Sequence, residues 1–145
     1  MKKLVIFLLM NCLMAAPAMA RDTVSSYSIE EAFAVQKLRN KLGTDVDFYF
    51  GEQKHGKVKT DLGEWRSTKK TNAFNKSDKR ACQRVLYSAL ISLRDRAQLE
   101  GGNAVINIKS NYKNVVTSSE TTFRCGAGAL MAGVALIGTV VTLEK

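Results

Sequence analysis

Apolar residues recur every three or four positions over residues 78–100, the spacing of one face of a helix. Ser77 is a typical N-cap residue, and Gly101 and Gly102 follow as a stop. This pattern predicts one long amphipathic helix. The positions that we expect to face the core are Cys82, Val85, Leu86, Ala89, Leu90, Leu93 and Ala97.

A second, shorter helix is expected over residues 29–42. Ser28 and Glu31 form a capping box at its start, because the serine side chain can bond the backbone three residues on and the glutamate can bond back. Gly43 follows as a stop. This helix would precede the long one in the chain.

Shorter alternating stretches predict strands over residues 46–50, 58–68 and 104–108. The first two are separated by a turn-rich connection, residues 51–56, so we expect them to form a hairpin. Gly63 lies inside the second strand and predicts a bulge there.

The C-terminal run, residues 126–143, carries no charge. It is at the lower limit of length for a membrane span and contains four glycines, and its second half is rich in β-branched residues. We therefore expect two buried strand segments that bend at the glycines, rather than a membrane-spanning helix.

The first 20 residues have the organisation of a secretory signal peptide. Two lysines precede an apolar run over residues 4–14, and a small-x-small site ends at Ala20. Cys12 follows Asn11, where a lipoprotein signal needs a small residue, so we expect no lipid anchor. Export with cleavage after Ala20 places the protein in the periplasm or outside the cell.

The remaining residues, 21–145, are enough for one domain with a hydrophobic core. The predicted elements indicate an α+β fold, in which a long helix and a shorter N-terminal helix pack on a mainly antiparallel sheet.

Cys82 and Cys125 are the only cysteines in this part of the chain. In an oxidising compartment such a pair is expected to form a disulfide, which would join the long helix to the sheet. The alternative is two buried free thiols that pack as small apolar side chains.

Positive charge is concentrated in one stretch. The chain carries 22 basic and 13 acidic residues, and ten basic residues but only three acids lie between Lys54 and Arg84. Such a field favours anionic partners, such as lipid head groups, lipopolysaccharide phosphates or a negative protein surface. The alternative is a solvated face without a partner.

One motif resembles a phosphate-binding P-loop. Residues 51–57 (GEQKHGK) match its first seven positions, but Val58 stands where the motif needs Ser or Thr, and the residues that follow alternate like a strand instead of opening a helix. We therefore predict no nucleotide site, and we expect no nucleic-acid partner.

Other catalytic or metal-binding patterns are weak. His55 is the only histidine, so no catalytic triad with a second histidine is possible, and the cysteines lack the close spacing of structural zinc sites. We expect no catalytic residues, no resident metal and no cofactor.

Several segments carry a resemblance to a known family: KTNAFNKSD at 70–78, Ala81-Cys82, GNAVINI at 102–108, Cys125, and MAGVAL at 131–136. They resemble a family of small exported bacterial proteins that are often labelled automatically as an excinuclease ATPase subunit. That label implies DNA repair by a large cytoplasmic ATPase with zinc motifs and complete P-loops, which residues 21–145 do not contain. We therefore judge the label wrong for this chain.

The long helix, the turn at 102–105 and the CGAG segment at 125–128 are more distantly similar to the sensor lipoprotein of the Rcs envelope-stress phosphorelay. They are also similar to a heavy-metal-binding fold of small oligomeric bacterial proteins. Both resemblances imply an α+β domain with a helix packed on a sheet. The sensor has four cysteines and a lipid anchor, and this chain matches it at Cys82 and Cys125.

We expect this protein to act without catalysis, as a binding or stress-related interaction module of the cell envelope that works through a basic face. The expected contact surface consists of Lys69, Lys70, Asn72, Phe74, Asn75, Lys76, Lys79, Arg80 and Arg84. Phe74 would be an apolar anchor and the basic residues would attract an envelope protein or an anionic envelope component.

Two alternatives stay open. In the first, Asn72 and Asn75 only bond the loop backbone and cap the helix, while Phe74 fills the core. In the second, the protein is an oligomer that binds a small ligand or a heavy metal, with the apolar tail strands as its subunit interface.

Overall fold

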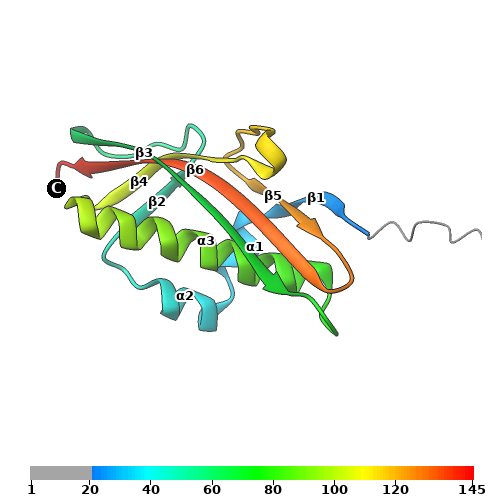
Figure 1. The fold of residues 1–145 in the computed structure, drawn as a ribbon. Helices are drawn as coiled ribbons and strands as arrows, with labels where there is room; N and C mark the ends of the chain where they lie inside the picture. The colour runs from blue at the N-terminus through cyan, green and yellow to red at the C-terminus, as the bar shows by residue number, and fades with distance from the viewer. Residues whose placement is uncertain (1–20) are drawn as a thin grey trace, which may run out of the picture.

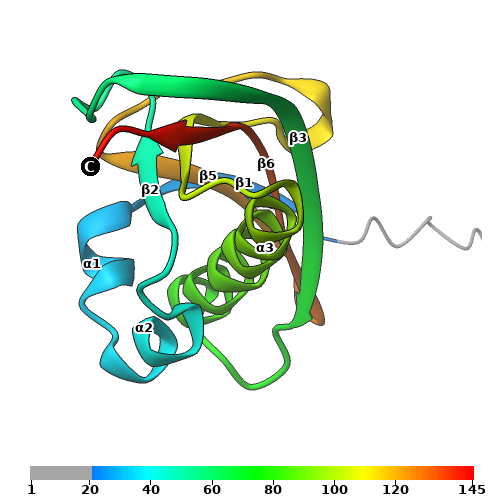
Figure 2. The ribbon, with the colours of Figure 1, turned by 90° about the vertical axis from the view of Figure 1, so that its left-hand side faces the viewer.

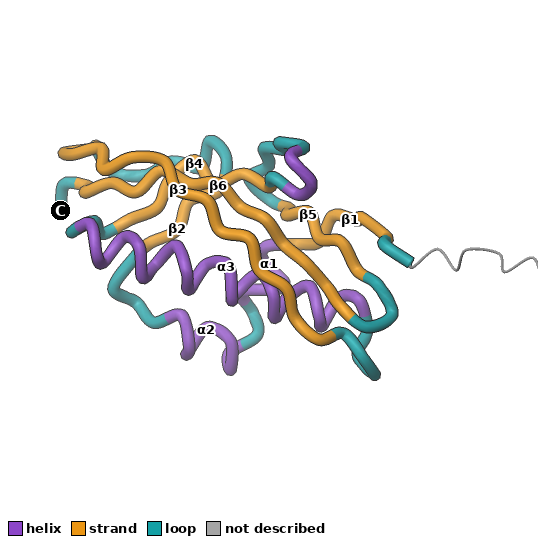
Figure 3. The backbone as a smooth tube through the Cα atoms, viewed as in Figure 1, coloured by secondary structure: helices purple, strands orange, loops and turns teal. Residues whose placement is uncertain are grey.

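The computed structural model describes residues 21–145, which form one curled sheet with the longer helices on a single face (Figures 1 and 3). The predicted signal peptide, its cleavage site and Cys12 lie outside the described residues. The elements in chain order are β1 (Thr23–Ser28), α1 (Ile29–Phe33), α2 (Gln36–Leu42), β2 (Asp47–Phe50), β3 (Val58–Asn72), α3 (Asp78–Glu100), β4 (Ala104–Ser110), the short 3-10 helix η1 (Tyr112–Asn114), β5 (Thr122–Ala127) and β6 (Met131–Leu143).

The sheet is organised around β6. Its strand order is β1-β5-β6-β4-β2, and β3 pairs along the other edge of β6. All these pairs are antiparallel except β2 with β4, which is parallel. The predicted α+β class with a mainly antiparallel sheet is therefore confirmed.

The long helix α3 has the predicted bounds. The hydroxyl of Ser77 accepts a hydrogen bond from the Arg80 N–H at 3.2 Å, and Gly101 ends the helix with a left-handed φ of 80°. All the predicted core positions of the helix are buried. Figure 2 shows α3 enclosed by the curled sheet, with α1 and α2 on one side of it and β3 on the other.

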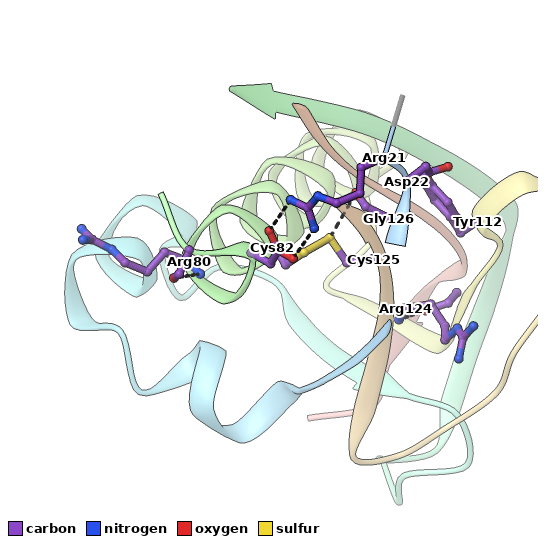
Figure 4. Close-up of a disulfide and its surroundings, with 11 residues drawn as sticks. Arg21, Asp22, Arg80, Cys82, Tyr112, Arg124, Cys125 and Gly126 are labelled. Atoms are coloured by element: carbon purple, nitrogen blue, oxygen red, sulfur yellow. Dashed lines mark hydrogen bonds and ion pairs between the residues drawn. A yellow bond between two sulfur atoms is a disulfide. The ribbon is translucent and has the colours of Figure 1, made fainter. Parts of the chain in front are cut away.

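A disulfide joins Cys82 of α3 to Cys125 of β5 (Figure 4). Both side chains are fully buried, and their Cα atoms lie 5.9 Å apart. The bond closes a loop with a sequence separation of 43 residues, and in the chain-entropy model such a loop contributes about 4 kcal/mol. The predicted link between the helix and the sheet is confirmed, in place of two free thiols.

The predicted N-terminal helix is broken in two. Val35 has extended backbone angles between α1 and α2. The Ala32 carbonyl, which an unbroken helix would bond to the Gln36 N–H, instead accepts from the Tyr87 hydroxyl at 3.1 Å and from the Val35 N–H at 3.2 Å. A tertiary contact with α3 therefore replaces the local helical bond.

The predicted hairpin of residues 46–50 and 58–68 is wrong. Both strands exist, but β2 pairs with β4 and β3 pairs with β6. The reason is that β6 offers a thirteen-residue apolar partner to β3, which itself continues to Asn72. The register shift between Asp61 and Glu64 confirms the bulge expected at Gly63.

The uncharged C-terminal run forms strands, as predicted. It contains the end of β5 and all of β6, joined by the short turn 128–130. Within the described residues most of β6 is buried and both its edges are paired. No helix within residues 21–145 is long and apolar enough to cross a membrane.

Tyr112 covers a pair of glycines on the sheet face opposite α3. Gly126 and Gly133 are partners in the β5–β6 register, and a Cβ atom at Gly126 would overlap the Tyr112 ring. The Tyr112 hydroxyl also donates to Asp22 at 3.2 Å. The ring therefore occupies the space of two absent side chains and ties η1 to the start of β1.

Candidate binding surface

The structure distributes the nine predicted contact residues over three places. Lys69, Lys70 and Asn72 lie on the last residues of β3. Phe74, Asn75 and Lys76 lie in the loop between β3 and α3, and Lys79, Arg80 and Arg84 lie in the first turns of α3.

The loop between β3 and α3 is held by its own hydrogen bonds. The Asn72 side-chain oxygen accepts from the Phe74 N–H at 2.7 Å, and the Lys76 ammonium donates to the Asn72 carbonyl at 3.2 Å. Asn75 adopts a left-handed φ of 55°, which asparagine tolerates well. Asn72 and Asn75 therefore shape the loop, as one alternative proposed, although Ser77 caps the helix.

Phe74 does not fill the core, because its side chain is 57% exposed. The residue before it, Ala73, is buried and donates its N–H to the Leu130 carbonyl at 2.8 Å. The chain is thus anchored on one side of Phe74 while the ring itself projects into solvent.

A second loop lies beside this one. Asn72 pairs with Met131 in the β3–β6 register, which brings the β5–β6 turn next to Phe74. Leu130 is 63% exposed and Met131 is 48% exposed. We call Phe74, Leu130 and Met131 the apolar tip.

Sequence reasoning missed Leu130 and Met131, because the uncharged run that contains them predicts buried strands. A signal was nevertheless present. A turn between two strands normally carries polar residues, whereas this one reads Gly-Ala-Leu. A large apolar residue in such a turn is expected to be exposed to solvent, because a turn between strands lies at the surface and not in the core.

Three lysines lie within five positions of Phe74 in the chain, and we call Lys69, Lys70 and Lys76 the tip lysines. Lys69 and Lys70 are consecutive on a strand, so their side chains leave opposite faces of the sheet. Lys69 lines the groove between β3 and α3, and Lys70 lies close to Gly133 on the other face. Within residues 21–145 none of the tip lysines forms an ion pair.

The acid at the start of α3 is already neutralised. Arg21 donates two hydrogen bonds to the Asp78 carboxylate, at 2.9 and 3.0 Å (Figure 4). These bonds and the positive charge of Arg21 lower the pKa of Asp78, and Asp78 in turn raises the pKa of Arg21. Sequence reasoning did not include Arg21 in the site, since 57 residues separate it from Asp78.

Asp22 is engaged in the same way. It forms an ion pair with Lys113 and accepts the hydrogen bond from Tyr112. The hydrogen bond from Lys113 is the main cause of its lowered pKa, and the charge of Lys70 contributes. Asp22 and Asp78 are therefore both neutralised by ion pairs, whereas the three tip lysines have no such partner within residues 21–145.

The remaining predicted residues belong to a different surface. Lys79 pairs with Glu31 of α1. Arg80 and Arg84 line a groove of about 200 Å³ between α2 and α3, together with Lys37 and Lys41. Figure 4 shows Arg80 directed away from Arg21, so the helix separates this second basic surface from the Arg21 side.

The groove between β3 and α3, which Lys69 lines, has a volume of about 410 Å³. The Arg96 guanidinium stacks on the Trp65 ring at 4.1 Å, and this pair together with the exposed Leu99 forms part of its walls. Arg96 also pairs with Glu100 at 3.3 Å. The groove therefore mixes cationic, acidic and apolar groups.

The segment that resembles a P-loop has a different geometry. β3 begins at Val58, where a P-loop would open a helix. His55 is exposed, and its Nδ1 lies 2.7 Å from the Gly56 carbonyl oxygen. In the described part of the chain, no cluster of three or more His, Cys, Asp or Glu side chains could hold a metal ion.

The GNAV turn has a structural role. The Asn103 side chain donates to the Leu143 carbonyl at 3.1 Å and accepts from the Leu143 N–H at 2.8 Å. It thereby fixes the end of β6 to the start of β4.

Comparison of the chain with protein-family models, with curated proteins and with solved structures found no match. The fold and the geometry of these surfaces therefore carry the functional argument.

Proposed function

We propose that this protein is an exported binding module of the cell envelope and that its contact surface is the apolar tip with the tip lysines. The observation that supports this best is the presentation of Phe74. Its ring is exposed, while the hydrogen bonds of Asn72 and Ala73, the two residues before it, hold the backbone in place. An exposed aromatic group on a fixed backbone loses little entropy on binding, as expected of an interaction anchor.

The partner in this proposal is an envelope protein or an anionic envelope component. The tip lysines supply the attraction, since they form no ion pair within the described residues. The disulfide is compatible with an oxidising compartment outside the cytoplasm. The proposal contains no catalytic step, and a role in envelope stress rests on the distant resemblance to the Rcs sensor.

The test is binding to an envelope fraction of the host at increasing salt. Lys69→Glu with Lys70→Glu should weaken binding at least tenfold and flatten its salt dependence, because both side chains are exposed and neither forms an ion pair in residues 21–145. Lys76 is left unchanged because it supports the loop.

Lys54→Glu with Lys59→Glu is the matched control. It makes the same change in net charge near the other end of β3 and should bind like the unmodified protein. Equal binding of both double variants would refute the proposal.

A further inference from the structure

We propose that the occupant of the apolar tip is the surface of an anionic lipid bilayer. This inference rests on the proposed function and names the partner class of the same site. In the docked state Phe74, Leu130 and Met131 enter the boundary between head groups and acyl chains, and the tip lysines contact lipid phosphates.

The first argument is the grouping of apolar side chains. Phe74 and Leu130 belong to loops that are more than 50 positions apart in the chain, yet the bond from the Ala73 N–H to the Leu130 carbonyl joins them directly. The other large apolar side chains exposed within residues 21–145 are scattered: Leu99 lies at the end of α3, and Val115 and Val116 follow η1. The tip is thus the place where exposed apolar groups from separate loops meet.

The second argument is shape. Figure 1 shows the loop after β3 and the turn before β6 projecting together at one end of the sheet. A stable protein interface generally needs about 800 Å² on each partner, arranged as complementary surfaces. Three side chains on two projecting loops fit a fluid surface that can deform around them better than they fit a preformed protein pocket.

The third argument is the placement of charge behind the tip. Lys70 lies two residues before the end of β3, which is about 7 Å along a strand. Amphipathic segments that lie in a bilayer interface insert by about 5–10 Å. When the tip enters to this depth, Lys69 and Lys70 reach the level of the head groups, one on each face of the sheet.

The fourth argument is the neutralisation of nearby acids. Asp78 is bound by Arg21, and Asp22 is bound by Lys113. A free carboxylate at the head-group level would be repelled by lipid phosphates, whereas a basic residue near an anionic membrane is attracted. The local ion pairs leave the tip lysines as the charges that face the membrane.

The experiment uses the disulfide-bonded protein as the host processes it, with vesicles of phosphatidylglycerol and phosphatidylethanolamine or of phosphatidylcholine alone. Sedimentation with the vesicles measures binding. We expect binding to the anionic vesicles that falls with added salt, and at least tenfold weaker binding to phosphatidylcholine.

Phe74→Ser with Leu130→Ser should reduce binding to the anionic vesicles at least tenfold. Leu99→Ser with Val116→Ser is the matched control, because it removes equally exposed apolar side chains elsewhere, and it should bind normally. Circular dichroism and the intact disulfide verify that each variant is folded.

A second measurement detects insertion without removing the contact. Phe74→Trp in a Trp65→Phe background places the single tryptophan of the chain at the tip. Its fluorescence should shift to the blue with anionic vesicles and be quenched by brominated acyl chains. Leu99→Trp in the same background should show neither change.

Three outcomes would overturn the inference: no binding to anionic vesicles, equal binding of the tip variant and its control, or an unshifted tryptophan at position 74. If vesicles fail while binding to the envelope fraction still depends on Lys69 and Lys70, the partner is a protein or a polymer, and the proposed function stands without the lipid. If both fail, both proposals are refuted.

Discussion

The two ends of the β3–β6 pair differ in how far their apolar side chains are buried. At one end Leu143 is buried with Ala104 and Val141 in a small apolar cluster. The Asn103 side chain forms hydrogen bonds with both the N–H and the carbonyl of Leu143. At the other end the same two strands lead to Phe74 and Leu130, which project into solvent. The same pair of strands is therefore covered at one end and carries exposed apolar side chains at the other.

The largest expected effect concerns the bond that fixes the open end. Cys82 lies one turn into α3 and Cys125 lies near the end of β5, so the disulfide holds together the elements on which the tip is mounted. Replacing both cysteines by alanine should lower the free energy of unfolding by about 4 kcal/mol. Urea unfolding of the variant and of the unmodified protein, oxidised and reduced, measures it. A variant as stable as the oxidised protein would contradict the assignment.

The next effect compares a leucine at each end. Leu143→Ala should cost about 2 kcal/mol, because it removes buried apolar contacts, whereas Leu130→Ala should change stability by less than about 0.5 kcal/mol. Both variants are measured by urea unfolding under one condition. Equal losses would show that Leu130 packs in the folded protein and that the two ends do not differ.

Asn103→Ala should cost about 1 kcal/mol, because it leaves the Leu143 N–H and carbonyl without their partner. Hydrogen exchange should become faster at Leu143 and stay unchanged at Ala73, whose amide bonds the other end of the ladder. Faster exchange at both amides would mean that the two ends open as one unit.

The smallest expected effect is the pH dependence of the Arg21–Asp78 pair. The bonds from Arg21 lower the pKa of Asp78 below its ordinary value of 3.8, so the pair stabilises the folded state above that pH. The contribution is lost as the pH falls from 3.8 through the folded pKa. Asp78→Asn should therefore be slightly less stable than the unmodified protein at pH 7, and the difference should shrink toward pH 3. The effect is small because the pair is exposed and solvent screens most of the attraction between the two charges. A difference in stability that stays constant with pH would refute the role of the Asp78 charge.

The sequence predicted those features of the fold that depend on interactions between residues close together in the chain. The cap at Ser77, the apolar face of α3 and the stop at Gly101 follow from residues close in the chain, and all are confirmed. The pairing of β3 and the break at Val35 were missed, because they depend on β6 and on Tyr87, which are far away in sequence. β1 was missed for the same reason, since its pairing with β5 defines it.

The candidate site also combines residues that the sequence predicted with residues that only long-range contacts bring to it. Phe74 and its lysines were included in the predicted surface because charge and an aromatic residue coincide in one short segment. Leu130, Met131 and Arg21 join them only through strand register and a long-range ion pair. Arg80 and Arg84 were grouped with them by sequence alone, and the helix turns both toward α2.

The free edge of β3 has a consequence for self-association. Within the described residues β3 has β6 as its single strand neighbour, so fifteen residues of backbone lie along an open sheet edge. Such an edge can recruit a second chain and begin a fibril. The irregular register around Gly63 and the charged side chains along β3 oppose that addition. Substitutions that regularise this strand and remove its charge should therefore convert a folded protein into one that aggregates before it unfolds.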